Sequence, residues 1–111
     1  MKKKYESCGL NYELIADRYP DLNEYEDIVN TYLSDEFFHQ LEEMLDQEDY
    51  AMAKDALKGL YILASDLCLY PLYEGLLEIY EDLEYEMYTD TMHHYQEMMN
   101  TYQKIRGIFH A

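Results

Sequence analysis

The chain has 111 residues, of which 24 are acidic and 8 are basic, and its formal net charge at pH 7 is −16. A charge of this size repels the phosphates of nucleic acids, so we expect no nucleic-acid partner. Hydrophobic residues make up 49% of the chain, which argues against disorder and, at this length, predicts one compact domain.

The N-terminal part of the chain predicts a short helix and then a long one. Residues 1–8 are expected to form a flexible tail. A short helix begins after Asn11, which can cap it, and runs to about Arg18, because Pro20 must end it. Between residues 21 and 46 the apolar side chains recur at helical spacing, which predicts one long helix.

Three further helices are predicted in the rest of the chain. They are a central helix from Asp49 to between residues 66 and 69, a helix from Pro71 toward Tyr88, and a last helix that stops at Gly107. Short links between the helices imply antiparallel neighbours. We therefore predict an all-α fold for residues 9–107, an antiparallel up-and-down four-helix bundle with a short additional N-terminal helix, followed by a C-terminal tail at residues 108–111.

The central helix has an apolar face and a second face opposite to it. The residues expected in the core are Ala53, Ala56, Leu57, Leu60, Leu63, Ala64 and Leu67. The second face carries Asp55, Lys58, Gly59 and Ile62, which lie three, four and seven residues apart. A glycine inside a helix costs about 1 kcal/mol relative to alanine, and the close approach of a partner is a common reason to tolerate it.

The second face carries a resemblance to a known family. Asp55-Ala56-Leu57-Lys58-Gly59 resembles the His-x-Leu-Lys-Gly signature of histidine-containing phosphotransfer (HPt) domains, with aspartate at the position of the phosphorylated histidine. Gly9-Leu10-Asn11-Tyr12-Glu13 resembles the start of the family's short first helix. The leucines expected in the helix after the histidine are matched by Leu69, Leu72 and Leu76. The resemblance extends over residues 9–105 and includes the order and lengths of the helices.

The resemblance implies a module of two-component signalling. It implies that Lys58 lies near a phosphoryl group during docking and that Gly59 lets a loop of the partner come close. Lys54 and Lys58 bracket Asp55 in a region otherwise devoid of positive charge, which indicates a docking face. No phosphoryl-accepting role passes to Asp55, because a carboxylate is a poorer nucleophile than imidazole and no neighbouring acids are placed to hold the Mg²⁺ that receiver domains use.

We therefore expect a non-catalytic protein that binds a response-regulator receiver domain or another signalling protein, as a monomer or weak dimer. The residues expected to bind this partner are Asp55, Lys58, Gly59, Ile62 and Lys54. One alternative is a structural or oligomerising helical bundle with no phosphorelay role. In another, Asp55 is simply a solvent-exposed helical acid, for which Lys54 and Lys58 are candidate partners.

The remaining candidate chemistries find little support in the sequence. The histidines are His39, His93, His94 and His110. Only Asp90-x-x-His93 approaches the Glu-x-x-His motif of di-iron bundles, and it has no second copy, so we expect surface histidines and no metal site. A nucleophile elbow, a Gly-rich phosphate loop and paired carboxylates in an apolar pocket are all missing. We expect neither enzymatic activity nor a cofactor.

The chain contains 14 tyrosines, many of them seven residues apart. Seven residues are two helical turns, so each such pair lies on one side of a helix. We predict that these tyrosines lie at the margin of the core, with the ring inside and the hydroxyl in water. A tyrosine-lined partner surface is the alternative.

The sequence also favours a cytoplasmic location. The basic run Met1-Lys2-Lys3-Lys4 is followed by a polar segment, so we expect no export signal. The most apolar stretch, residues 57–73, contains two charged side chains and a proline, which argues against a membrane span. Cys8 and Cys68 have no metal-binding spacing and fit reduced thiols.

Overall fold

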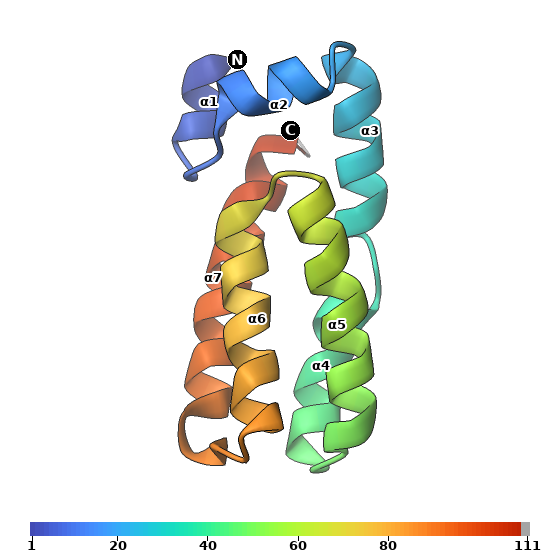
Figure 1. Ribbon diagram of the computed structural model, residues 1–111, viewed down its shortest axis with the longest axis vertical. Helices are drawn as coiled ribbons and strands as arrows, with labels where there is room; N and C mark the ends of the chain where they lie inside the picture. The colour runs from blue at the N-terminus through green and yellow to red at the C-terminus, as the bar shows by residue number, and fades with distance from the viewer. Residues whose placement is uncertain (110–111) are drawn as a thin grey trace.

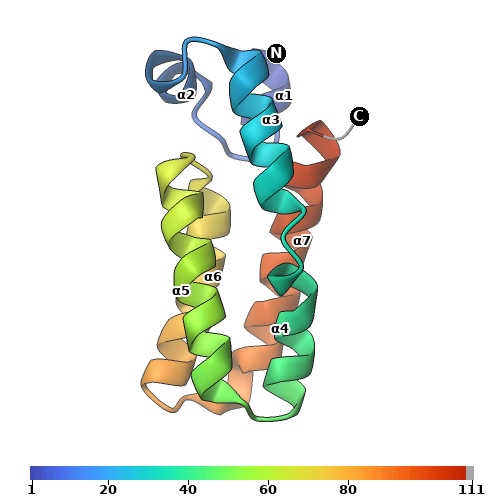
Figure 2. The ribbon, with the colours of Figure 1, turned by 90° about the vertical axis from the view of Figure 1, so that its right-hand side faces the viewer.

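The computed structural model describes residues 1–109, which form helices joined by short turns and contain no strand. The all-α prediction is therefore confirmed. The elements are α1 (Lys2–Glu6), α2 (Tyr12–Arg18), α3 (Leu22–Leu33), α4 (Phe37–Asp46), α5 (Tyr50–Asp66), α6 (Tyr70–Glu84), the 3₁₀ helix η1 (Tyr88–Asp90) and α7 (Thr91–Phe109). In Figure 1 and Figure 2, α5, α6 and α7 lie side by side along the long axis, α3 and α4 follow one another along it, and α1 and α2 cross one end. None of the helices within residues 1–109 combines the length and apolarity that crossing a membrane requires.

The starts of three helices follow local capping rules. The side chains of Asn11, Asp21 and Asp49 each accept a hydrogen bond from the backbone N–H three residues further on. Such a cap satisfies one of the four N–H groups that have no partner at a helix start. Pro71 lies in the first turn of α6, where its missing N–H removes no helical hydrogen bond. These predicted starts are therefore confirmed.

The prediction of one long helix over residues 21–46 is wrong, because the helix is interrupted between Leu33 and Phe37. Here polar side chains bond to nearby backbone groups. The Ser34 hydroxyl donates to the carbonyl of Asn30 at 2.8 Å, and the Asp35 carboxylate accepts from the N–H of Phe37 at 2.9 Å. Short polar side chains that offer the backbone such partners compete with the helix, and apolar spacing alone does not reveal them.

Both predicted tails are shorter than expected. Residues 2–6 form α1, and the Tyr5 ring is fully buried, with its centroid 5.4 Å from that of Phe109. Phe109 is also buried, so α7 continues past Gly107 through residues 108 and 109. The two aromatic rings bury apolar surface against each other, and this packing orders both segments. Residues 110–111 of the predicted C-terminal tail lie outside the described residues.

The core contains most of the predicted apolar face of α5. Ala53, Ala56, Leu57, Leu60, Ala64 and Leu67 are buried as predicted. Leu63 is 47% exposed, and its assignment to the core is wrong. The reason is tertiary, since α3 packs mainly against α7 and leaves this side of α5 uncovered.

Four tyrosines are buried together with their hydroxyl groups. Tyr25 donates to the carbonyl of Leu67 at 2.6 Å, and Tyr32 donates to the carbonyl of Leu60. Tyr95 and Tyr102 of α7 likewise donate to backbone carbonyls, those of Phe38 and Leu33. Burial raises the pKa of the Tyr25 and Tyr32 hydroxyls above the usual value, so both remain proton donors. The prediction that the hydroxyls lie in water is wrong for these four residues.

We expect Tyr25→Phe to lower the free energy of unfolding by about 1–3 kcal/mol, because it leaves the carbonyl of Leu67, the residue that ends α5, without its partner. Tyr80→Phe is the control. Tyr80 is half-buried, and its hydroxyl has no hydrogen-bond partner among the described residues. Urea unfolding followed by circular dichroism measures both variants. Equal losses would contradict a specific role for the Tyr25 hydroxyl.

Candidate functional site

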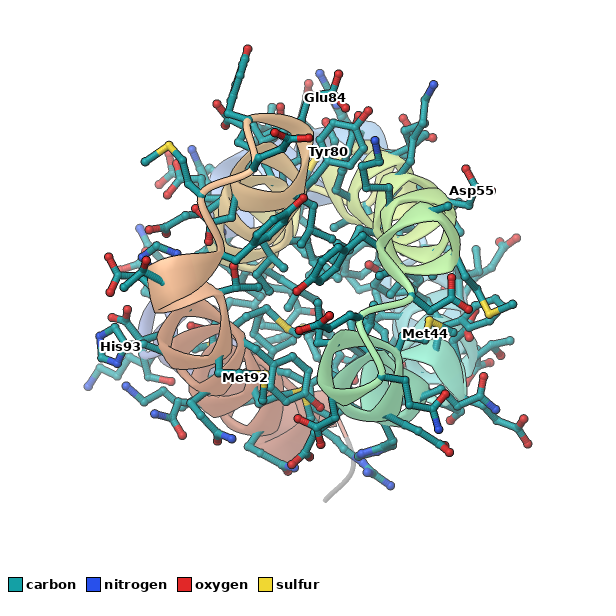
Figure 3. All side chains as sticks on the ribbon, turned by 90° about the horizontal axis from the view of Figure 1, so that it is seen from below. Met44, Asp55, Tyr80, Glu84, Met92 and His93 are labelled. Atoms are coloured by element: carbon teal, nitrogen blue, oxygen red, sulfur yellow. The ribbon has the colours of Figure 1, made fainter. Side chains whose placement is uncertain are left out.

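The predicted binding residues lie on the outer side of α5. Asp55, Lys58, Gly59 and Ile62 are all exposed, and Ile62 keeps 45% of its surface open to solvent. Figure 3 shows the Asp55 side chain pointing away from the other helices. The helical spacing brings these four residues to one surface, which we call the α5 face.

The glycine on the α5 face has no packing reason inside the protein. A Cβ atom added at Gly59 would meet no atom of residues 1–109 within 4 Å. Gly75 of α6 is the contrasting case, because a Cβ there would lie 3.2 Å from the Cβ of Met98 in α7. The absence of a side chain at position 75 thus permits close helix packing. At Gly59, by contrast, the absence of a side chain leaves the helix backbone open on its outer side.

The two lysines near Asp55 have different surroundings. The Lys54 ammonium lies 3.3 Å from a carboxylate oxygen of Glu84, so this side chain reaches toward α6. Within residues 1–109, neither Asp55 nor Lys58 has an ion-pair partner, and the alternative pairing of Asp55 with a neighbouring lysine is not formed. Lys58 is therefore the cation of the α5 face that is available to a partner.

The α5 face offers no support for phosphoryl transfer through a metal ion. Among the described residues, no group of three or more His, Cys, Asp or Glu side chains is arranged to hold a metal. A receiver-type aspartate needs such a group, because the bound Mg²⁺ offsets the charge that develops on the phosphoryl oxygens.

A groove lies beside the α5 face, between α3 and α5. It has a volume of about 410 Å³ and is lined by Ile28, Thr31, Tyr32, Asp35, Leu63, Asp66 and Leu67. We call it the α3–α5 groove. The sequence did not predict it, since it depends on the interruption after Leu33 and on the packing of α3 against α7.

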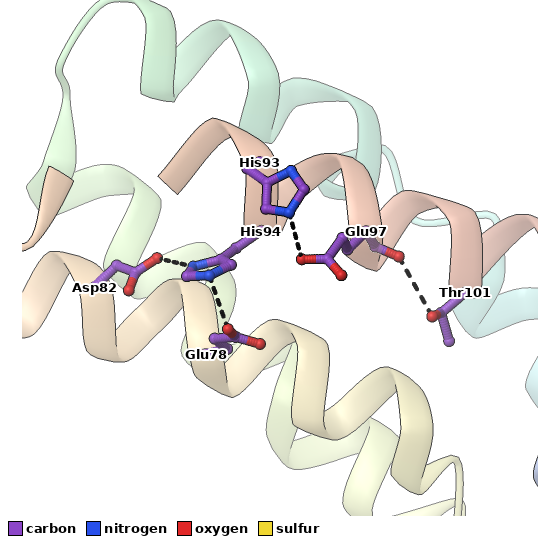
Figure 4. A network of polar contacts seen from close by, with 6 residues as sticks. All are labelled: Glu78, Asp82, His93, His94, Glu97 and Thr101. Atoms are coloured by element: carbon purple, nitrogen blue, oxygen red, sulfur yellow. Dashed lines mark hydrogen bonds and ion pairs between the residues drawn. The ribbon is translucent and has the colours of Figure 1, made fainter. Parts of the chain in front are cut away.

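A third arrangement, between α6 and α7, joins His94 to two carboxylates. The Nδ1 atom of His94 lies 2.5 Å from a carboxylate oxygen of Asp82, and its Nε2 atom lies 2.9 Å from a carboxylate oxygen of Glu78 (Figure 4). Asp82 is buried, and only 19% of the His94 side chain is exposed. The prediction of a surface histidine is therefore wrong for His94. Asp82 and His94 lie 12 residues apart on two helices, so no helical spacing reveals their contact.

The other histidines differ from His94. His39 and His93 are exposed, as predicted, and His93 lies 3.1 Å from a carboxylate oxygen of Glu97 on its own helix. The position of His110 lies outside the described residues.

The carboxylates around His94 favour its charged form. The hydrogen bond that His94 donates to Asp82 raises the pKa of His94, with further support from the charges of Glu78 and Asp90, while burial opposes the shift. A protonated imidazole donates from both nitrogens, which matches the two acceptors. In its protonated form His94 thus donates to a carboxylate on each side and links α7 to α6.

This link predicts a pH-dependent contribution to stability. Because folding raises the pKa of His94 above its unfolded value of about 6.5, the stabilisation is complete below that pH and is lost as the pH rises through the folded pKa. We expect the difference in unfolding free energy between the wild type and His94→Gln to be largest below pH 6.5 and to shrink above it. The control is His93→Gln, which removes the exposed neighbour. A difference that does not vary with pH, or the same pH profile for both variants, would contradict this role.

No protein-family model, no curated protein and no solved structure matches the chain. Its function must therefore be inferred from the residues themselves.

Proposed function

We propose that this protein is an HPt-like four-helix bundle that binds a response-regulator receiver domain through the α5 face and does not accept a phosphoryl group. In this proposal the interrupted pair α3–α4 is the first helix of the bundle, and α5, α6 and α7 are the other three. The motif Asp55–Gly59 then falls on the second helix of the bundle. The protein would act in the cytoplasm as a monomer or weak dimer.

The observation that carries this proposal is the open surface at Gly59. A glycine in the interior of a 17-residue helix costs about 1 kcal/mol relative to alanine. None of the described residues approaches position 59 closely enough to require it. A partner backbone that packs against α5 at this point would explain why a glycine, rather than a better helix former, occupies position 59.

The neighbours of Gly59 support docking of an acidic partner. Lys58 lies one residue away and makes no ion pair within the described chain, so its charge can face an incoming carboxylate or phosphoryl group. Ile62 lies three residues away and adds exposed apolar surface. A positive charge beside an apolar contact suits a protein–protein interface, where charge steers association and apolar burial slows dissociation.

We expect Gly59→Arg to weaken receiver binding by more than about 2 kcal/mol, because the arginine side chain fills the space that a partner backbone needs. The fold should remain stable, since position 59 is exposed and arginine favours the helix more than glycine does. Calorimetric titration against receiver domains encoded in the same genome measures the affinity, and melting temperatures measure the stability.

The matched control is Gly107→Arg. Gly107 is also helical and exposed, and a Cβ there also meets no atom within 4 Å among the described residues. It lies on α7, away from the proposed interface. If no receiver binds the wild type, or if both arginine variants bind equally well, the docking proposal fails and a structural or oligomerising bundle becomes the better interpretation.

We also expect no phosphoryl transfer to this protein. Incubation with Mg²⁺ and receiver domains charged by acetyl phosphate should leave it unlabelled. Position 55 carries a carboxylate instead of the imidazole of a phosphotransfer histidine, and no described group of acids is placed to hold a metal beside it. Intact-protein mass spectrometry detects an added phosphoryl group, and a working HPt domain serves as the positive control. Stable label on any histidine would return this protein to the class of working phosphotransfer domains.

A further inference from the structure

The α3–α5 groove combines an apolar floor with apolar walls. Tyr32 and Leu67 are buried and form part of the floor. Ile28 of α3 and Leu63 of α5 stand on opposite sides, with 42% and 47% of their surfaces exposed. The lining extends along α3 from Ile28 to Tyr32 and on to Asp35 in the interruption after α3. Two exposed aliphatic side chains thus face each other across a space that the protein does not fill.

The sequence pattern shows that this space is an uncovered part of the core stripe. Leu63 belongs to the apolar series of α5, whose other predicted members are buried. It is exposed because α3 packs mainly against α7 (Figure 2) and reaches α5 chiefly through the side chains of Tyr25 and Tyr32. The groove is therefore a place where a further helix can cover apolar surface that α3 leaves open.

The charges around the groove indicate which charge a partner helix should carry. Asp35 and Asp66 belong to its lining, and no basic residue does. Asp27 lies one turn before Thr31 on the same side of α3 and adds a third carboxylate near the groove. A helix with an apolar stripe flanked by Lys and Arg complements both the apolar walls and the acidic edges.

A second copy of this chain fits the groove poorly. Each chain carries a net charge of −16, so two copies repel each other. The basic N-terminal run is already engaged, because Lys2 lies 3.0 Å from Glu13 and Lys4 lies 3.7 Å from Glu26. The same negative charge disfavours an anionic lipid surface.

We propose that the α3–α5 groove binds a cationic amphipathic helix of a partner protein. The groove adjoins the α5 face, because Leu63 lies four residues after Gly59 and Asp66 lies four residues after Ile62 on the same helix. Its proposed occupant differs from that of the α5 face, and the test below uses no receiver domain. The groove can therefore be tested independently of the docking proposal.

The test uses a fluorescein-labelled synthetic peptide of about 14 residues with leucine at positions i, i+3, i+4 and i+7 and lysine elsewhere. Fluorescence anisotropy should show that the full chain binds it. A peptide of equal charge with serine in place of leucine, and a peptide with glutamate in place of lysine, should each bind at least about tenfold more weakly, because each lacks one of the two complementary features.

Paired variants locate the peptide. Leu63→Gln should weaken binding at least about fivefold by removing apolar contact, whereas Met52→Gln, which alters an equally exposed apolar residue elsewhere on α5, should not. Asp66→Lys should weaken binding at least about threefold more than Asp46→Lys. Both aspartates are exposed last residues of a helix, where the helix dipole favours lysine, and the two variants change the net charge equally.

Three results would overturn the proposal. One is the absence of binding to the wild type. Another is equal affinity within either pair of variants, which would show that the peptide responds to the overall charge rather than to the groove. The third is a wild-type dimer in sedimentation that Leu63→Gln dissociates, because a second copy would then be the occupant.

Discussion

The structure depends on the pairing of buried backbone carbonyls with tyrosine hydroxyls. The carbonyl of Leu33 has no helical partner because α3 ends there, and Tyr102 of α7 donates to it. Tyr95, two turns earlier on the same side of α7, donates to the carbonyl of Phe38 on the other side of the interruption. An unpaired buried carbonyl would cost about 1–3 kcal/mol, so the bond from Tyr102 makes the end of α3 compatible with burial. The two tyrosine bonds also fix both helices against α7.

The same constraint creates the α3–α5 groove. Once α3 is held against α7, its contact with α5 is made largely by the long side chains of Tyr25 and Tyr32, whose hydroxyls reach the carbonyls of Leu67 and Leu60. These bonds join the two helices without bringing their backbones together. An apolar side chain such as Leu63 therefore stays open to solvent although its spacing belongs to the core. The tyrosine–carbonyl hydrogen bonds thus position α3 in the fold and also leave the groove beside it.

Local information in the sequence predicted the helices and the placement of the α5 face. Cap residues such as Asn11 and Asp49 bond to backbone groups three residues away, and the exposed spacing of Asp55 and Gly59 follows from helical geometry alone. The interruption between α3 and α4 has a local cause that apolar spacing does not reveal, whereas two other missed features depend on distant contacts. The burial of Tyr5 against Phe109, and the joining of His94 to Asp82, bring together residues far apart in the chain, and no periodicity encodes such pairs.

The distribution of cations connects the stability of this acidic chain to its proposed function. With 8 basic and 24 acidic residues, most carboxylates have no cation to offset them. Lys4 and Lys54 each bridge two helices, and His94 does the same between α6 and α7. Exposed bridges contribute less than about 1 kcal/mol each, yet they lower repulsion where helices meet. Lys58 makes no such bridge within the described residues, although it lies on the central helix beside an open glycine. In the proposed function, this charge attracts an acidic partner to the α5 face.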